Sequence, residues 1–285
     1  MYPIFCQVEE SAMENKGIKS PLSYIGGKCY LAPWIIEHFP LHKVYVEPFG
    51  GAGHVLCKKD PGLSTLEVYN DTCSEIVNLF RVLQDEKKSE ILMMLIELTP
   101  HSREWFCNLR DCKYLPPVVS EDLKQAYKTL VLMKQSFAGD WMNRTGSWAF
   151  DKQKDNVSKS FFRMPEKLQN LINRIKKVQI DHLDFRECIL RYDSPDTLFY
   201  CDPPYYGKEF YYEGGFGEQE HRELAGLLNS IQGKAILSYY DFEFVSEWYP
   251  KNKWRIESKN IQKPSHKVEA GGTRAMAEEL LIMNF

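Results

Sequence analysis

Apolar positions along the chain follow two kinds of pattern. Short continuous apolar runs bounded by turn residues predict buried strands, and apolar residues three or four positions apart predict helices. The runs predict seven strands, at Lys43–Glu47, Thr65–Tyr69, Val178–Ile180, Leu198–Cys201, Ala235–Ser238, Trp254–Glu257 and Leu280–Asn284. The helical spacing predicts helices at Cys73–Gln84, Glu90–Leu98, Glu121–Gln135, Pro165–Lys176 and Glu218–Leu228.

Strands and helices alternate at both ends of this pattern but not in its middle. Between about residues 88 and 160, helical stretches lead into a polar segment with scattered aromatic residues and no repeated strand signal. We therefore predict an α/β fold, a seven-stranded Rossmann-like sheet interrupted by a mostly helical insertion. Residues 1–87 and 161–285 form the sheet domain in this prediction and residues 88–160 the insertion. Residues 1–20 are expected to be a loosely ordered leader, with structure beginning at Pro21.

Composition narrows the class of protein only slightly. A chain of 285 residues with 44% apolar and 26% charged residues suits one sizeable soluble core with an inserted module. The net charge of −3 argues against a protein that is basic throughout, although a nucleic-acid binder needs only a local basic face. Eight cysteines without a Cys-x-x-Cys pair indicate reduced intracellular thiols, and we expect no metal site. No apolar run is long enough to span a membrane, so no membrane association is expected.

The most informative chemistry lies in the tetrapeptide Asp202-Pro203-Pro204-Tyr205. It follows the apolar run that predicts a buried strand at Leu198–Cys201, so it stands where that strand ends. A carboxylate, two rigid residues and an aromatic ring suit a planar base that carries an exocyclic amino group. The aromatic and glycine-rich stretch 206–216 that follows suits either a mobile lid over such a base or an exposed loop whose aromatic side chains are buried.

A second informative segment runs from Glu47 to Gly53, where a predicted strand enters a glycine-rich turn. Glycines allow the backbone to approach a nucleotide-like ligand closely, and the absence of a following Gly-Lys-Ser/Thr disfavours a nucleoside triphosphate. Asp71 ends the next predicted strand, where an acidic side chain can accept hydrogen bonds from ribose hydroxyls. The two features together indicate an adenosine-containing cofactor. The turn could equally use glycine for structural reasons, and Asp71 could equally cap a helix or a turn.

A third motif, Pro21-Leu22-Ser23-Tyr24-Ile25-Gly26-Gly27-Lys28, precedes the first predicted strand. With the glycine turn and the Asp202–Tyr205 tetrapeptide it stands in the order found in Dam-type adenine-N6 DNA methyltransferases (D12 class, alpha group). Residues 21–285 resemble that family over most of their length. The resemblance implies a methyltransferase sheet, S-adenosylmethionine as the methyl donor, and transfer to N6 of an adenine flipped out of duplex DNA.

The resemblance also implies roles for individual residues. Asp202 and the carbonyl of Pro203 would accept the hydrogens of the target amino group, and Tyr205 would stack on the base, with Pro204 completing the catalytic motif. The implied cofactor site consists of Tyr24, Lys28, Glu47, Pro48, Phe49, Gly51, Gly53, Asp71, Asp184, Phe185 and Asp202. In it Asp71 would hold the ribose, and Asp184 and Phe185 would flank the adenine. The alternative for Asp184 is an ordinary helix cap.

The predicted insertion contains the sequence expected to read DNA. Nine basic and three acidic residues between Arg144 and Lys177 give this segment a charge of +6, which suits contacts with phosphates. Within it, residues 136–148 resemble the recognition hairpin of Dam-type enzymes. We predict that DNA contacts come from Asn143, Arg144, Trp148, Lys152, Lys154 and Lys159. Enzymes that read GATC continue with Asn-x-Pro, but Ala149-Phe150-Asp151 stands here, so GATC is not assigned.

Two other functions remain open at this stage. A cytosine-N4 methyltransferase usually has Ser in place of Asp202, and a DNA-binding protein with an inactive methyltransferase core would not need an intact tetrapeptide and glycine turn. The sequence therefore favours an adenine-specific enzyme. Its expected partner is double-stranded DNA, with a cognate restriction endonuclease as a further partner and no obligate protein subunit. Its expected location is the cytoplasm of a prokaryotic or phage-infected cell.

Overall fold

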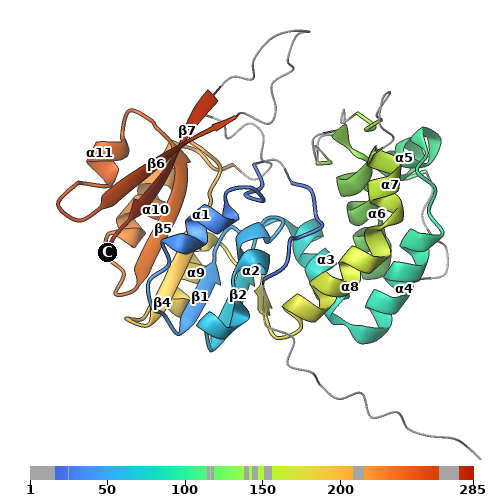
Figure 1. Ribbon diagram of the computed structural model, residues 1–285, viewed down its shortest axis with the longest axis horizontal. Helices are drawn as coiled ribbons and strands as arrows, with labels where there is room; N and C mark the ends of the chain where they lie inside the picture. The colour runs from blue at the N-terminus through green and yellow to red at the C-terminus, as the bar shows by residue number, and fades with distance from the viewer. Residues whose placement is uncertain are drawn as a thin grey trace, which may run out of the picture.

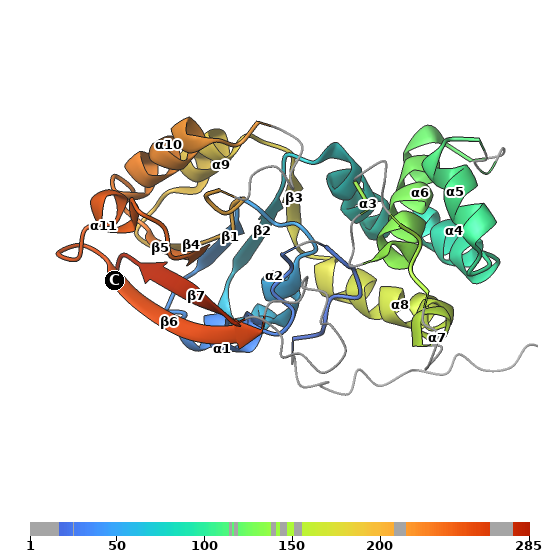
Figure 2. The same cartoon turned by 90° about the horizontal axis from the view of Figure 1, so that it is seen from above.

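The computed structural model describes residues 17–24, 26–113, 116, 119–137, 141–142, 147–150, 156–207, 215–262 and 276–285. The described chain forms a twisted sheet with helices on both faces and a group of helices beside it (Figure 1). Figure 2 shows the two layers of helices above and below the sheet and the helical group at one end. Among the described residues, no helix has the length and apolarity needed to cross a membrane.

Seven strands make up a single sheet in the order β3-β2-β1-β4-β5-β7-β6. Neighbouring strands from β3 to β5 are parallel, whereas β7 is antiparallel to both β5 and β6. The strands are β1 (Val44–Glu47), β2 (Leu66–Asn70), β3 (Gln179–Asp181), β4 (Thr197–Cys201), β5 (Lys234–Tyr240), β6 (Arg255–Gln262) and β7 (Met276–Met283). The predicted seven-stranded α/β sheet is therefore confirmed.

Alternate residues of the central strands point to opposite faces of the sheet, as a pleated strand requires. On β1, Tyr45 belongs to one buried cluster and Val46 to the other, and on β4 the same holds for Tyr200 and Phe199. The face with Val46 is covered by α9 (Phe185–Tyr192), α10 (Glu218–Leu228) and α11 (Val245–Trp248). The other face is covered by α1 (Ala32–Glu37) and α2 (His54–Lys58), and the short η1 (Pro61–Leu63) leads into β2. Burial on both faces explains why these strands are continuous apolar runs.

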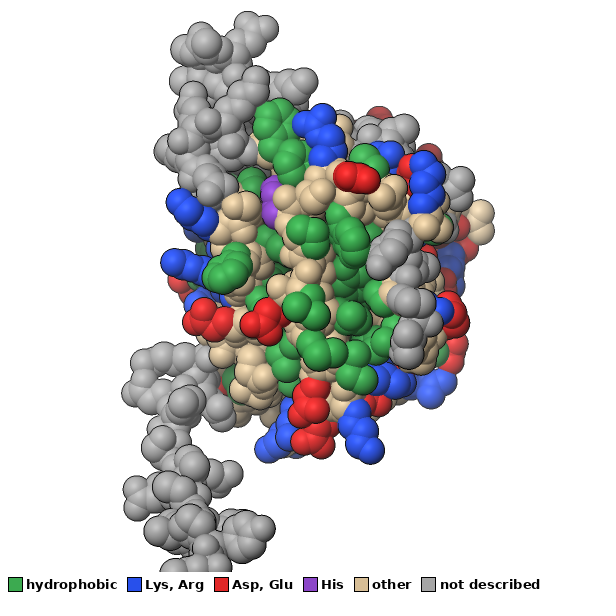
Figure 3. Space-filling model, turned by 90° about the vertical axis from the view of Figure 1, so that its right-hand side faces the viewer, with side chains coloured by type: hydrophobic (Ala, Val, Ile, Leu, Met, Phe, Trp, Pro, Cys, Tyr) green, Lys and Arg blue, Asp and Glu red, His purple; other side chains and the backbone are tan. Residues whose placement is uncertain are grey.

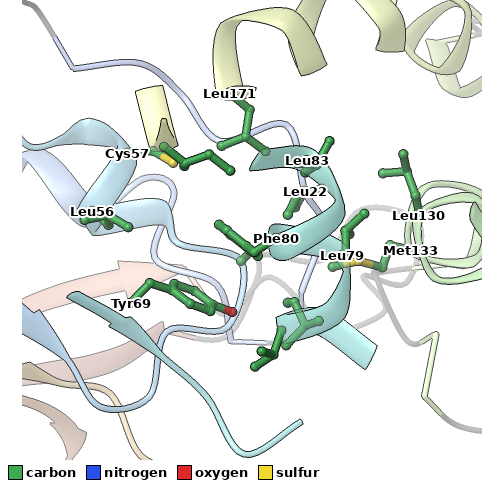
Figure 4. Close-up of a cluster of buried hydrophobic side chains, with 14 of the residues drawn as sticks. Leu22, Leu56, Cys57, Tyr69, Leu79, Phe80, Leu83, Leu130, Met133 and Leu171 are labelled. Carbon is green, nitrogen blue, oxygen red and sulfur yellow. The ribbon is translucent and has the colours of Figure 1, made fainter. Parts of the chain in front are cut away.

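The helical group lies between β2 and β3 in the sequence. Its members are α3 (Ser74–Gln84), α4 (Glu86–Glu97), α5 (Arg103–Arg110), α6 (Glu121–Gln135), α7 (Asn156–Phe162) and α8 (Met164–Ile175). Its core is continuous with that of the sheet, because Phe80 of α3 stacks on Tyr69 of β2 at 4.1 Å between ring centroids (Figure 4). Leu130 and Met133 of α6 approach the same cluster from the other side. The group is therefore anchored to the sheet by shared buried apolar contacts.

The outer side of the helical group has apolar side chains in its middle and charged ones around its rim (Figure 3). Ile91, Met94 and Leu98, on or next to α4, are exposed apolar residues of the helical group. Since phosphate contacts need cations, the middle of this side does not suit DNA.

Several boundaries differ from the sequence prediction. Helix α4 begins at Glu86 rather than Glu90, because the Asp85 side chain caps it by accepting a hydrogen bond from the Lys88 N–H at 3.0 Å. The short helices α5, α7 and α9 were not predicted. The ordered chain also begins before Pro21, since the Ile18 N–H donates to the Cys57 carbonyl at 2.8 Å and Ser20 is buried. The predicted loose leader is thus wrong for residues 17–20, and residues 1–16 lie outside the described part.

Candidate active site

The three sequence motifs meet at the carboxyl edge of the parallel strands. Strands β1 and β4 are neighbours at the point where the order of the sheet reverses, and ligands of open α/β sheets bind in the crevice at that point. A cavity of about 1180 Å³ opens there. Its lining includes predicted site residues from every motif, namely Tyr24, Lys28, Glu47, Phe49, Gly51, Asp71, Asp184, Phe185, Asp202 and Pro204. Pro48, Gly53, Pro203 and Tyr205 do not line it.

The glycine turn after β1 is held by the end of β2. The Asp71 carboxylate accepts the Gly51 N–H at 2.8 Å, while the Tyr69 hydroxyl donates to the Gly51 carbonyl at 2.7 Å. Gly51 and Gly53 have φ values of 48° and 61°, a region that side chains other than glycine enter at a cost. Gly50 was not predicted to matter, yet a Cβ on it would lie 2.3 Å from the Tyr69 ring. The three glycines therefore allow the turn to pack tightly against β2.

Asp71 has the structural role that the sequence left open as an alternative to ribose binding. Its second carboxylate oxygen accepts the Cys73 N–H at 2.8 Å, ahead of α3, in addition to the bond from Gly51. The side chain is buried, and this burial raises the pKa of the carboxyl while the backbone donors oppose the rise. Both oxygens thus brace the backbone on the cavity wall, which fixes the carboxylate where it lines the cavity.

Three phenylalanines form an aromatic cluster on the cavity wall. Phe49 and Phe185 stack with ring centroids 5.5 Å apart, and Phe216 meets them edge-on or tilted at 5.7 and 5.6 Å. Phe216 was not among the predicted cofactor residues, because the sequence placed it only in a loop rich in aromatic residues. The cluster offers the flat apolar surface on which a purine can pack.

Asp184 caps α9, as the structural alternative held. Its carboxylate accepts the Arg186 N–H and lies 2.9 Å from an Arg186 guanidinium nitrogen. It nevertheless lines the cavity next to Phe185. Capping and cavity lining are therefore compatible in this residue.

Asp202 stands directly after the buried strand β4 and forms an ion pair with Lys28. Nζ of Lys28 lies 2.8 Å from Oδ1 of Asp202 and also donates to the Gly26 carbonyl at 2.8 Å. Burial raises the pKa of the Asp202 carboxyl, and the Lys28 ammonium opposes that rise. The same ammonium lies 4.8 Å from the centre of the Tyr205 ring. The Pro21–Lys28 motif and the Asp202–Tyr205 tetrapeptide are thus joined by an ion pair and by a cation–π contact.

Glu47, at the end of β1, is a buried carboxyl on the cavity wall. The Tyr45 hydroxyl donates to its Oε1 at 2.7 Å. Burial raises the pKa of Glu47 to about 8, and the hydrogen bonds from the Tyr45 hydroxyl and the Leu56 backbone only partly oppose this rise. At neutral pH the group is therefore mostly protonated.

Most of the predicted DNA-contacting residues lie outside the described part of the chain. These are Asn143, Arg144, Lys152 and Lys154. Lys159 is exposed on α7. Trp148 is half-buried, packed against His101 at 4.9 Å and under the Arg103 guanidinium at 5.3 Å. Of the predicted residues that are described, Lys159 alone therefore presents an exposed cation.

Two basic residues of the helical group have partners that the sequence did not reveal. Arg174 was counted in the basic segment, but it is only 5% exposed and binds Glu67 of β2 through two nitrogens at 2.7 and 2.8 Å, so it is not part of a phosphate-binding face. Lys134 of α6 donates to the Pro21 carbonyl at 3.0 Å and to the Ser23 hydroxyl at 3.2 Å. Its burial lowers its pKa to about 8. It thereby ties the helical group to the Pro21–Lys28 motif.

The aromatic stretch after the tetrapeptide is described only at its ends. Tyr206 packs between Phe242 and Trp248, at 5.5 and 5.8 Å between ring centroids. Phe216 packs at 4.7 Å on His221 of α10. Both ends are therefore held by the layer of helices, and residues 208–214 lie outside the described part.

Comparison with known proteins agrees with these motifs. The family model of the D12 class N6 adenine-specific DNA methyltransferases matches residues 24–267. A DNA adenine methylase of Vibrio cholerae serotype O1 is 27% identical over 192 residues, which cover 65% of this chain and 64% of that methylase. This chain thus spans just under two thirds of the Vibrio protein. A type II methyltransferase of Lactococcus lactis subsp. cremoris is 23% identical, with 92% of this chain and 94% of that protein covered. A DNA adenine methylase of Haemophilus influenzae is 24% identical, with 87% and 90% covered.

Proposed function

The chain belongs to the D12 class of N6 adenine-specific DNA methyltransferases, and we propose that it transfers a methyl group from S-adenosylmethionine to N6 of an adenine in duplex DNA. The observation that carries the proposal is that Asp202 lines the same cavity as the glycine turn and the phenylalanine cluster. One pocket thereby brings an acceptor for an amino group next to a surface for a nucleoside.

The residues on the cavity wall fit an adenosine-containing methyl donor. Phe49, Phe185 and Phe216 supply aromatic faces for the adenine, and Asp71 supplies carboxylate oxygens for the ribose. Asp202, and Glu47 once it has released its proton, give the wall acidic groups that suit a positively charged donor. When bound, the donor supplies an electrophilic methyl group on a sulfonium. The volume of about 1180 Å³ exceeds the roughly 300–1,000 Å³ of ordinary ligand pockets, which supports a pocket that takes a base as well as the donor.

Asp202 has the central chemical role in this proposal. The amino nitrogen of adenine is a poor nucleophile because its lone pair is delocalised into the ring. Asp202 and the carbonyl of Pro203 accept its two hydrogens, which localises the lone pair and orients the nitrogen towards the methyl group. Tyr205 stacks on the base, which has left the duplex because its amino group cannot reach the cavity otherwise. In the described structure Lys28 occupies Oδ1 of Asp202, so the target amino group binds Oδ2 or displaces the ammonium.

Residues 88–160 are the proposed target-recognition part, which contains α5, α6, most of α4 and the first part of α7. Its position supports the assignment, because Lys134 ties α6 to the motif that carries Lys28 and because Trp141 and Met142 line the same cavity. A base that enters the cavity therefore passes this part of the molecule. Duplex DNA is the proposed partner. The cytoplasm of a prokaryotic or phage-infected cell is the proposed location.

Incubation with methyl-labelled S-adenosylmethionine and duplex DNA of mixed sequence tests the function. After digestion to nucleosides, we expect the label in N6-methyl-2′-deoxyadenosine. Label in N4-methylcytosine would instead show the cytosine enzyme, and a protein that binds DNA without transferring label would be an inactive relative. Sequencing the methylated positions then gives the recognition site.

A further inference from the structure

Glu279, on strand β7, is a buried carboxyl that belongs to none of the sequence motifs. It is 1% exposed, and the hydroxyl of Tyr205 donates a hydrogen bond to its Oε1. The same oxygen lies 3.9 Å from Nζ of Lys28. One carboxylate thus contacts both Tyr205 of the tetrapeptide and Lys28 of the Pro21–Lys28 motif.

The sheet topology explains why Glu279 reaches this site. Strand β7 is inserted between β5 and β6, and its register places Glu279 opposite Tyr240 of β5. The Tyr240 ring meets Tyr205 edge-on with centroids 4.7 Å apart, and Tyr239 lies 5.6 Å from the same ring. The Tyr205 ring is therefore bounded by β5, while its hydroxyl is fixed by β7.

The charges around Glu279 form a compact group. The Lys28 ammonium lies between two carboxylates, 2.8 Å from Asp202 and 3.9 Å from Glu279. An ammonium that contacts two carboxylates can stay paired with one of them while the other binds a different partner. If Glu279 were neutral, the whole charge of Lys28 would be directed at Asp202.

We propose that Glu279 is a positioning residue for methyl transfer. It fixes the Tyr205 ring through the Tyr205 hydroxyl, and it serves as the ion-pair partner of the Lys28 ammonium when Asp202 receives the target amino group. The inference rests on the proposed function, because it assigns Asp202 and Tyr205 to the target base. Glu279 acts through these residues and through Lys28 rather than on the base itself.

The pH dependence expected from this role follows from the surroundings of Glu279. Burial raises the pKa of Glu279 to about 6, Lys28 and the Tyr205 hydroxyl oppose the rise, and Asp202 adds to it. Among the described residues, Tyr200 of β4 and Tyr240 of β5 are the other ionisable groups that face it. Its register partner on β6, Lys259, is exposed and lies over the Trp34 ring. Protonation of Glu279 below pH 6 therefore removes the second ion-pair partner of Lys28, and kcat should fall in that pH range.

The test compares Glu279→Gln, Glu279→Ala and the control Glu278→Gln, whose side chain is exposed on the same strand. Glu279→Gln keeps an acceptor for the Tyr205 hydroxyl but has no charge for Lys28. We expect kcat to fall about tenfold at pH 8 with the donor Kd unchanged, and the decline of kcat near pH 6 to disappear. Glu279→Ala should fall further and raise KM for DNA, whereas Glu278→Gln should retain the wild-type profile.

A double-mutant cycle with Tyr205→Phe separates positioning from general destabilisation. If Glu279 fixes Tyr205, the effects of Glu279→Ala, which removes the acceptor, and Tyr205→Phe on kcat are less than additive. Wild-type kcat and an unchanged acidic decline in Glu279→Gln would overturn the inference, as would fully additive effects in the cycle. Failure of the wild-type protein to methylate adenine would overturn the proposed function instead. Thermal unfolding of each variant shows whether it is folded.

Discussion

Asp71 braces the glycine turn at Gly51, because its Oδ2 accepts the Gly51 N–H at 2.8 Å across twenty residues of sequence. Its other oxygen accepts the Cys73 N–H at the same distance. A residue expected to hold a ribose thereby also shapes the wall on which that ribose would lie. The two roles make different predictions, since one concerns the stability of the free protein and the other concerns donor affinity.

Asp71→Asn should lower the free energy of unfolding even without ligand. An amide can accept only one of the two backbone N–H groups and points its own NH₂ at the other, which costs about 1–2 kcal/mol. Denaturant unfolding of the free protein measures this loss. Asp60→Asn is the control, since the exposed Asp60 side chain also accepts a backbone N–H, from Gly62 at 2.7 Å. Equal stability in wild type and Asp71→Asn would remove the bracing role.

Asp202→Ala should abolish transfer while S-adenosylmethionine binding persists. Loss of an acceptor that acts mainly in the transition state lowers kcat by roughly 10²–10³-fold or more. Transfer of label to DNA measures kcat, and calorimetry measures donor affinity. Asp196→Ala is the control, because Asp196 is an exposed aspartate next to the opposite end of β4 and pairs with Lys43. Turnover within a few-fold of wild type would contradict the role given to Asp202.

Glu47 should couple donor binding to pH. Its pKa of about 8 lies above that of an unfolded glutamate, so its contribution to stability is complete at acidic pH and is lost as the pH rises through about 8. A positively charged donor favours the carboxylate, so binding at pH 7 should release a proton and become tighter as the pH rises through 8. Calorimetry in buffers with different ionisation enthalpies measures that proton.

The matched variants are Glu47→Gln and, on the exposed side of β6, Glu257→Gln. Glu47→Gln should release no proton and should lose less stability between pH 6 and 9 than the wild type. Glu257→Gln should behave as the wild type in both measurements. Proton release that persists in Glu47→Gln would assign the titration to another group.

The lysines of the recognition segment should set the salt dependence of DNA binding. Replacing Lys152, Lys154 and Lys159 with alanine should weaken binding and reduce the slope of log K against log salt by about one unit per lysine. Fluorescence anisotropy with a labelled duplex at several salt concentrations measures the slope. Lys87, Lys251 and Lys253, which are exposed elsewhere, form the control triple. Identical slopes in the two triples would leave the recognition lysines as ordinary surface charges.

The sheet was predictable because its strands are buried on both faces, which makes runs such as Thr197–Cys201 continuously apolar. Short helices were not predictable, since α9 has only eight residues and its start depends on the Asp184 cap. The motifs predicted the cavity because Lys28, Gly51 and Asp202, which line it, each belong to a short sequence motif that is recognisable without the structure.

The sequence did not predict the roles of residues whose partners lie far away along the chain. Arg174 looked like one more cation of a basic segment, but its partner Glu67 is 107 positions away. Glu279 looked like an ordinary strand residue, because nothing near it in the sequence indicates that Tyr205 will donate to it. Such contacts are set by the order of the strands, which local patterns do not encode.

The position of β7 also has a consequence for biosynthesis. The ribosome makes β7 after β6, yet β7 lies between β5 and β6, so β6 has no place in the sheet until residues 276–283 have emerged. Glu279 is delivered by that same segment. A nascent chain that has already built the glycine turn and the tetrapeptide therefore still lacks the group that fixes Tyr205, and the site is assembled only after β7 has joined the sheet.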